Sequence, residues 1–184
     1  ALLRDWDGHY RIDSVGALAF EQVTANFIAA FFTEAERAVL SPGGHFDEFM
    51  GEELIRAEPA RVAAALGPAL DKAAAGVEKF GVWGEMHRIG LRHPLGFIPV
   101  VGERFRFTDA PVAGSTTTVM KTAHSDTAER HFTRFGSQAR QISDLSDPDA
   151  NYFALLGGQD GWFNSSTFLD QFELWQRGDY VRLP

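Results

Sequence analysis

The sequence predicts an α+β fold, with helices in the first half and short strands and a closing helix in the second. Apolar residues recur at helical spacing between Val15 and Val39. From Gly81 onward, glycine and proline become frequent and the apolar runs become short. The chain therefore divides into a helical segment, 1–80, and a segment of strands, loops and a final helix, 81–184.

The longest predicted helix begins after Ser14, whose hydroxyl can cap its first turn. The run Ser41-Pro42-Gly43-Gly44 is expected to end it. The apolar positions that define this helix are Val15, Leu18, Val23, Phe27, Phe31, Ala35 and Val39. Its phenylalanines, with Phe20 and Phe32, form a stripe that is typical of core packing and less typical of an acyl-binding cavity.

Three shorter helices are expected before the strands begin. One covers 47–56, and Pro59 suits the first helical position of the next, which covers 60–66. The Gly67-Pro68 pair is predicted to break the chain, and an alanine-rich helix then runs to about Phe80.

The second half contains three strand candidates, at 116–122, 138–145 and 152–156. The segment 166–177 returns to helical spacing, and Gly178 is placed to stop it. Its cap is Ser165 or Asn164, and its apolar positions are Phe168, Phe172 and Trp175. Few strands separated by long irregular connections are unusual in a domain that stands alone, so we expect missing partner strands.

Composition indicates a folded chain and excludes several partners. The 184 residues are 45% hydrophobic and 12% aromatic, enough for one domain with a core. The net charge of −8 without a basic cluster argues against nucleic acid. There is no cysteine, which excludes disulfides and thiolate chemistry. The longest apolar run, 27–32, is far shorter than the roughly 20 residues of a membrane span, so no membrane partner is expected.

The six histidines do not show the spacing of a metal site. His87 and His93 lie on different faces of a helix or on one face of a strand, and Pro94 disturbs either element. His124 and His131 flank a polar segment. Neither pair has the i, i+4 spacing of a helical zinc site, so we expect surface or hydrogen-bonded structural histidines and no metal.

Other chemical motifs are incomplete or have simpler explanations. Gly136-Ser137-Gln138-Ala139-Arg140 lacks the final glycine of a nucleophile elbow, and Gly114-Ser115-Thr116-Thr117-Thr118 is more typical of a strand. The three aspartates Asp144, Asp147 and Asp149 are typical of a turn around Pro148. The run Gly157-Gly158-Gln159-Asp160-Gly161 lacks the lysine of a phosphate loop and is expected to be a bend.

Several motifs along the whole chain, taken in order, resemble the penicillin amidase family. They are Trp6-Asp7-Gly8, 14–20, Trp83-Gly84-Glu85-Met86-His87-Arg88, His93-Pro94-Leu95-Gly96, 113–119, Gly136 with Arg140 and Asp144, Gly157, Gly158-Gln159-x-Gly161, Ser165, and Asp170-Gln171 with Trp175, Gly178 and Tyr180. The chain departs from the family pattern at Ala113, Met120 and Asp160, where glycine, asparagine and serine are frequent. These departures affect loop geometry and substrate details.

The resemblance implies the C-terminal portion of the β subunit of a four-layer αββα enzyme that cuts itself into α and β chains. In that family an N-terminal serine attacks the amide, its α-amino group acts as base, and an asparagine and a backbone amide stabilise the oxyanion. These residues precede the matched region, and the methyl group of Ala1 cannot attack. No catalytic, cofactor-binding or metal residue is therefore assigned to this chain.

The expected function is part of a multi-chain acylase that hydrolyses acyl-homoserine lactones, penicillin-type β-lactams or both. Its expected partners are the α chain, the N-terminal part of the β chain and a small N-acyl substrate, and this chain alone is expected to be inactive. The resemblance implies a periplasmic or secreted bacterial enzyme. It implies that this chain requires no cofactor, and it is compatible with a structural calcium elsewhere in the enzyme. The alternative is a noncatalytic binding or assembly domain.

Overall fold

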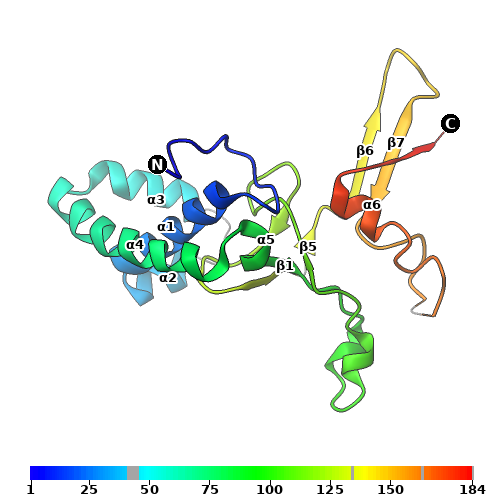
Figure 1. Ribbon diagram of the computed structural model, residues 1–184, viewed down its shortest axis with the longest axis horizontal. Helices are drawn as coiled ribbons and strands as arrows, with labels where there is room; N and C mark the ends of the chain where they lie inside the picture. The colour runs from blue at the N-terminus through cyan, green and yellow to red at the C-terminus, as the bar shows by residue number, and fades with distance from the viewer. Residues whose placement is uncertain (41–45, 134, 163, 184) are drawn as a thin grey trace. The chain divides into compact units, whose positions relative to one another are not determined.

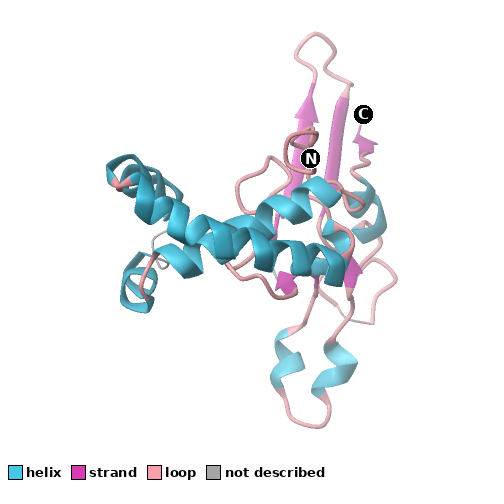
Figure 2. Cartoon of the chain, turned by 60° about the vertical axis from the view of Figure 1, so that its left-hand side comes forward, coloured by secondary structure: helices cyan, strands magenta, loops and turns pink. Residues whose placement is uncertain are grey.

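The computed structural model describes residues 1–40, 46–133, 135–162 and 164–183, and it confirms the α+β class (Figures 1 and 2). The chain forms two compact units. The helical unit comprises 1–9, 13–86 and 125–130, and the strand unit comprises 10–12, 87–124 and 131–184. Within the described residues, no helix has the length and apolar character needed to cross a bilayer.

The helical unit is built around two long helices that pack against each other, α1 (Val15–Phe31) and α4 (Pro59–Phe80). The shorter helices are α2 (Glu34–Leu40), α3 (Phe46–Arg56) and α5 (Trp83–Met86). The buried core contains Phe27, Ile28, Phe31, Phe32, Ala65 and Ala69, with Met50, Leu54, Ala57 and Val62 packed against it. Core packing of the phenylalanine stripe is thus confirmed, except that Phe20 is exposed and its ring lies tilted against Trp6, with centroids 5.4 Å apart.

The predicted start of α1 is confirmed, because the Ser14 hydroxyl accepts a hydrogen bond from the Ala17 amide. The predicted continuation to Val39 is wrong, since the chain becomes extended at Phe32. Thr33 and Glu36 then form a reciprocal capping box that begins α2: the Thr33 amide donates to the Glu36 carboxylate, and the Glu36 amide donates to the Thr33 hydroxyl. The predicted stop at 41–44 lies outside the described residues.

The helix predicted at 47–56 is confirmed, and it begins one residue earlier. Pro59 occupies the first turn of α4 as predicted. The predicted break at Gly67-Pro68 is wrong, because α4 runs through both residues to Phe80. Proline removes one helical hydrogen bond, but Ala65 and Ala69 on either side are buried against α1, and this packing maintains the helix.

Among the residues that the structure describes, the strand unit contains three small sheets. In the first, β1 (His87–Ile89) lies between β2 (Ala110–Pro111) and β4 (His131–Thr133), antiparallel to β2 and parallel to β4. The second pairs β3 (Thr122–Ala123) with β5 (Phe135–Gly136). Between β1 and β2 the chain forms two 3-10 turns, η2 (Pro94–Phe97) and η3 (Gly102–Phe105).

The third sheet has the order β6–β7–β8, with β6 (Ala139–Ser143), β7 (Asn151–Leu155) and β8 (Val181–Leu183) all antiparallel (Figure 1). Two of these strands confirm the predictions at 138–145 and 152–156. Helix α6 (Phe172–Arg177) packs against β7. The core of the unit consists of Ile89, Val112, Ala154, Leu156, Phe172 and Trp175.

The two faces of the third sheet differ. One face carries Ala154, which is buried together with Phe172 and Trp175 of α6. Because side chains alternate along a strand, the opposite face carries the neighbours of Ala154 and their partners in register. These are Ala139, Gln141, Ser143, Asn151, Phe153, Leu155, Val181 and Leu183. Val181 and Leu183 are exposed, so this largely apolar face has no complete cover within the described residues.

Two predicted elements of the second half are wrong in extent. Only Thr122 of the predicted strand 116–122 is in a strand, because the Thr118 hydroxyl bonds the backbone at Ser115 and Met120 and folds the segment into a turn. The predicted helix 166–177 begins only at Phe172. Gly178 ends it in the left-handed conformation (φ 82°), as predicted.

Candidate functional site

Three histidines that are far apart in the sequence come together in the strand unit. His87 lies on β1, His131 on β4, and His124 directly follows β3. The rings of His124 and His131 stack with centroids 4.4 Å apart, and the His87 ring meets them edge-on at 5.1 and 5.5 Å. His93 is not part of this cluster, because it caps η2 and lies against Phe105.

The environment of His87 favours the neutral imidazole. The side chain is fully buried, and burial, followed by the positive charges that His124 and His131 can carry, lowers the pKa of His87 to about 2. The Thr122 hydroxyl donates to the Ala113 carbonyl, so it must accept from His87 Nε2 at 3.0 Å. The cluster thus holds at least one imidazole that cannot act as an acid near neutral pH.

A serine–histidine pair lies at the edge of the same cluster. Ser115 Oγ is 2.8 Å from His124 Nε2, which is the separation expected of a nucleophile and its base. Ser115 is only 2% exposed, however, and its backbone is fixed by the Thr118 hydroxyl. A substrate carbonyl cannot reach the hydroxyl in this conformation, so the pair is better explained as a structural hydrogen bond.

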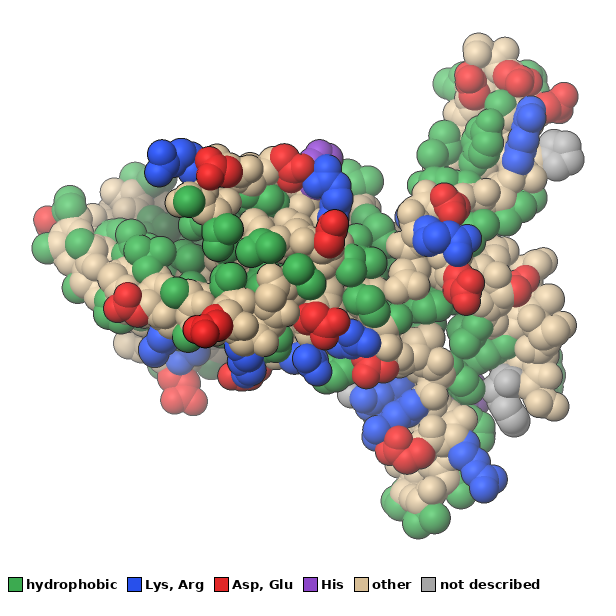
Figure 3. Space-filling model, in the orientation of Figure 1, with side chains coloured by type: hydrophobic (Ala, Val, Ile, Leu, Met, Phe, Trp, Pro, Cys, Tyr) green, Lys and Arg blue, Asp and Glu red, His purple; other side chains and the backbone are tan. Residues whose placement is uncertain are grey.

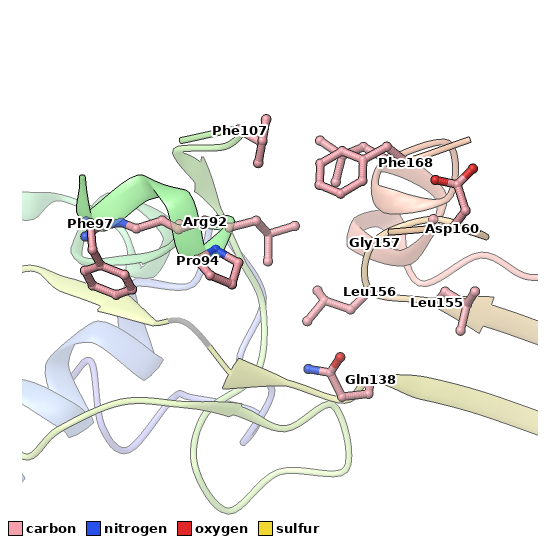
Figure 4. A pocket seen from close by; sticks show the side chains of 14 residues that line it. Arg92, Pro94, Phe97, Phe107, Gln138, Leu155, Leu156, Gly157, Asp160 and Phe168 are labelled. Atoms are coloured by element: carbon pink, nitrogen blue, oxygen red, sulfur yellow. The ribbon is translucent and has the colours of Figure 1, made fainter. Parts of the chain in front are cut away.

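The strand unit contains a cleft of about 560 Å³. Figure 4 shows Arg92, Pro94 and Phe97 on one side, Leu155, Leu156, Asp160 and Phe168 on the other, and Gln138 below them. The walls are mainly aliphatic and aromatic, and Phe107 and Phe168 meet edge to face with centroids 4.8 Å apart. The volume and the apolar lining suit a small apolar group, with Arg92, Gln138 and Asp160 as polar groups.

Asp160 lies at the polar end of the cleft. Its carboxylate accepts hydrogen bonds from the hydroxyls of Ser165 and Thr167 and from the Trp162 amide, at 2.6, 2.5 and 2.8 Å. These bonds, first those of the two hydroxyls, lower the pKa of the Asp160 carboxyl. The side chain therefore organises the bend that follows β7, and the predicted bend at 157–161 is confirmed.

The other residues considered from the sequence have structural positions. Asp144 accepts from the Ser146 amide and Asp147 accepts from the Asp149 amide, which confirms a turn at 144–150. Gly136 packs against Trp175, and the Arg140 guanidinium donates to the Trp175 carbonyl. Within 1–40, 46–133, 135–162 and 164–183, no group of three or more histidine, aspartate or glutamate side chains has an arrangement that could hold a metal ion.

Sequence reasoning did not find the histidine cluster or the cleft. The histidines were compared only as neighbours along the chain, whereas pairing of β1 with β4 brings His87 beside His131. These strands have three residues each, too few to show a period-2 pattern. A signal was available in the positions of His124, which directly follows β3, and His131, which begins β4, at the two ends of the polar segment 125–130.

These features define an α+β polypeptide with an apolar cleft in its strand unit. The family profile described as penicillin amidase matches residues 1–184. The chain therefore belongs to the penicillin amidase family, as the resemblance of its motifs indicated. A comparison with curated proteins found no match. Membership of this family indicates an acylase-type hydrolase.

Proposed function

We propose that this chain is the C-terminal portion of the β subunit of an acylase that hydrolyses the amide bond of N-acyl substrates. The substrates proposed are acyl-homoserine lactones, penicillin-type β-lactams or both. The nucleophilic serine and the oxyanion-stabilising asparagine belong to companion polypeptides of the same precursor. The family match over residues 1–184 is the observation that carries this proposal.

The third sheet supports a role in a larger assembly. One of its faces is covered by α6, whereas the other presents Phe153, Leu155, Val181 and Leu183 with exposed Val181 and Leu183. Packing apolar surface against a second layer contributes about 25 cal/mol per Å² buried, so such a face is stabilised by a covering sheet. A sheet with helices on one side and a second sheet on the other is the arrangement proposed for the complete αββα enzyme.

The cleft is the part of this chain that we assign to substrate binding. Its side chains from Leu91, Phe107 and Phe168 form an apolar wall against which an acyl chain or an aryl group can pack. A hydroxyl, base and oxyanion donor from the companion polypeptides would supply the chemistry. This chain contributes binding energy and shape, and the proposal assigns it no cofactor.

The proposal is tested on the protein purified from the cells that produce it. Intact-mass spectrometry and N-terminal sequencing should find companion polypeptides, one of which begins with serine. A serine-directed sulfonyl fluoride should label that serine, abolish release of free amine from N-acyl substrates, and leave this chain unmodified. Labelling of Ser115, or full turnover after complete labelling of the companion, would contradict the assignment of the nucleophile.

The alternative function, a noncatalytic binding or assembly domain, predicts a different result in the same preparation. In that case no polypeptide with N-terminal serine co-purifies, no N-acyl substrate is hydrolysed, and the chain alone unfolds cooperatively and binds a ligand. A panel of acyl-homoserine lactones of increasing chain length, together with aryl and aliphatic penicillins, distinguishes the proposed substrate classes by the rate of amine release.

A further inference from the structure

The outer edge of β6 carries hydrogen-bonding groups that point away from the third sheet. The Leu156 amide donates to the Gln138 carbonyl, and the Asp144 amide donates to the Ala150 carbonyl. Hydrogen-bonded pairs alternate with non-bonded pairs in an antiparallel ladder. The pairs Arg140–Ala154 and Ile142–Tyr152 are therefore bonded to β7, and the amides and carbonyls of Ala139, Gln141 and Ser143 face outward.

This edge lacks the usual features that prevent strand addition. Edge strands are commonly protected by proline, by a bulge, or by charged side chains that project along the edge. Strand β6 has the sequence Ala-Arg-Gln-Ile-Ser, without proline, and its register with β7 is continuous over all five residues. Its one charged side chain, Arg140, is folded against α6.

Arg140 also has unused hydrogen-bonding capacity. Its guanidinium lies 5.3 Å from the Trp175 ring centroid and 5.2 Å from the Tyr180 ring centroid, and its Nη2 donates to the Trp175 carbonyl at 2.6 Å. Its Nε is buried and has no hydrogen-bond partner among the described residues. A buried cationic donor without an acceptor is unfavourable, and a carboxylate is the acceptor that suits a guanidinium best.

We propose that the outer edge of β6 accepts a further strand from a companion polypeptide, and that this strand places an aspartate or glutamate opposite Arg140. The Cβ atoms of residues directly opposite each other on adjacent strands lie about 4.5–5.5 Å apart, so such a carboxylate lies beside the Arg140 side chain on the same face of the sheet. The incoming strand bonds the outward groups of Ala139, Gln141 and Ser143 and covers the half-exposed Ile142. This inference rests on the proposed function, because the companion polypeptide is its source.

A second copy of this chain does not satisfy the same requirements. Pairing of β6 with its own copy would place Arg140 opposite one of the residues Ala139 to Ser143, and none of these is acidic. The charge on Arg140 would then remain without a carboxylate. Self-association through this edge is thus an outcome that would contradict the inference.

The first test is amide hydrogen exchange of the wild-type assembly, resolved to single residues. The amides of Ala139, Gln141 and Ser143 should exchange at least about tenfold more slowly than the Arg182 amide, because each becomes hydrogen-bonded to the added strand. Arg182 is the matched internal control, since its pairing with Tyr152 leaves its amide on the outer edge of β8. Equal, rapid exchange at all four amides would overturn the inference.

The second test compares two proline variants of the assembly. Gln141→Pro removes an outward amide of β6 without breaking its ladder with β7, and Arg182→Pro does the same on β8. Gln141→Pro should weaken association with the companion polypeptide about tenfold or more, whereas Arg182→Pro should stay within about twofold of wild type. Equal effects of both variants, or no effect of Gln141→Pro, would overturn the inference.

These outcomes separate the inference from the function on which it rests. If no companion polypeptide co-purifies with the wild-type chain, both fail. If a companion co-purifies and amine is released from N-acyl substrates while the β6 amides exchange rapidly, the proposed function stands and the edge assignment is wrong.

Discussion

His87 Nδ1 and His131 Nδ1 lie 3.4 Å apart, and only one of these two nitrogens can carry a proton. His87 donates through Nε2 to Thr122, whose own proton is used on the Ala113 carbonyl. In neutral His87 the Nδ1 atom is therefore an acceptor, and His131 Nδ1 is the donor. Protonation of His87 would place two N–H groups against each other in a buried site.

The first prediction is acid sensitivity that originates at His87. In the unfolded chain the His87 imidazole takes up a proton near pH 6.5, whereas burial in the folded chain lowers the pKa of His87 to about 2. Between these values the unfolded state binds more protons, so stability is greatest above pH 6.5 and falls as the pH is lowered. The contribution of His87 between pH 7.5 and 4.5 is a loss of about 2–3 kcal/mol in the free energy of unfolding.

Denaturant unfolding at a series of pH values measures this slope. His87→Gln should flatten it, and His93→Gln, which alters a histidine outside the cluster, should leave it as in wild type. In addition, the ring-proton NMR resonances of His87 should not titrate between pH 8 and 5. A titration midpoint of His87 near 6.5 would contradict the account.

A second prediction concerns two helical glycines, Gly76 of α4 and Gly51 of α3. A Cβ at Gly76 would overlap the side chain of Gln22, which is 1% exposed and donates to the Ala128 carbonyl at 2.8 Å. Gly76→Ala should therefore destabilise the helical unit by about 1–3 kcal/mol. Gly51→Ala in α3 is the control, because no atom outside its chain neighbours and its own helix backbone lies within 4 Å of the new Cβ and no proline follows it, and it should stabilise by about 0.5–1 kcal/mol. Thermal unfolding of both variants measures the sign of each change in stability. Equal shifts in melting temperature would show that the contact with Gln22 does not determine the effect of Gly76→Ala.

The third prediction concerns backbone strain at Val100. This residue is 99% exposed and has φ 72°, a conformation that is unfavourable for a β-branched side chain. It lies in the segment between η2 and η3, where hydrophobic side chains gather at the surface (Figure 3). Val100→Gly should stabilise the protein by about 1 kcal/mol, because relief of strain exceeds the added chain entropy.

Val101, with φ −96°, provides the control for this change. Val101→Gly relieves no strain and should destabilise by about 0.5–1 kcal/mol. The two free energies of unfolding, measured in denaturant, should have opposite signs. Destabilisation by both substitutions would show that Val100 is not strained in solution.

The fourth prediction concerns the bend held by Asp160. Its lowered pKa means that the ionised carboxylate supports the folded bend above the ordinary carboxyl pKa of 3.8, and that this support is lost as the pH falls through the lowered value. Asp160→Asn should accelerate amide hydrogen exchange at Trp162, because the Trp162 amide donates a hydrogen bond to the Asp160 carboxylate. The Asp149 amide, bound by Asp147 in a different turn, should be unchanged. Unaltered exchange at Trp162 would show that another group holds the bend.

The sequence predicted those elements whose residues carry their own local signals. Ser14 at the start of α1, Pro59 at the start of α4 and Gly178 at the end of α6 were all recognisable from residue type. The predicted strands 138–145 and 152–156 overlap β6 and β7; in β7 the aromatic residues Tyr152 and Phe153 favour a strand, whereas in β6 only Ile142 does. The Thr-x-x-Glu pattern of the capping box at Thr33 and Glu36 is visible in the sequence. It was not used, because the helical spacing of apolar residues continues across the break at Phe32.

The remaining features depend on contacts that no local pattern records. Pro68 stays in a helix because α4 packs against α1, and the segment at 116–121 turns because the Thr118 hydroxyl bonds its own backbone. The cleft requires Phe107 and Phe168 to meet across more than fifty residues of sequence. Family resemblance predicted the enzyme class from ordered motifs, whereas the surfaces to which companion polypeptides would bind became visible only from the register of β6, β7 and β8.

The central claim is that these 184 residues act as one part of an amide hydrolase. Its most direct test measures amine release from N-acyl substrates by the assembly purified from producing cells and, at equal concentration, by this chain alone. The account predicts turnover by the assembly and none by the chain. Turnover by the isolated chain, or an assembly that hydrolyses no acyl-homoserine lactone and no penicillin, would contradict it.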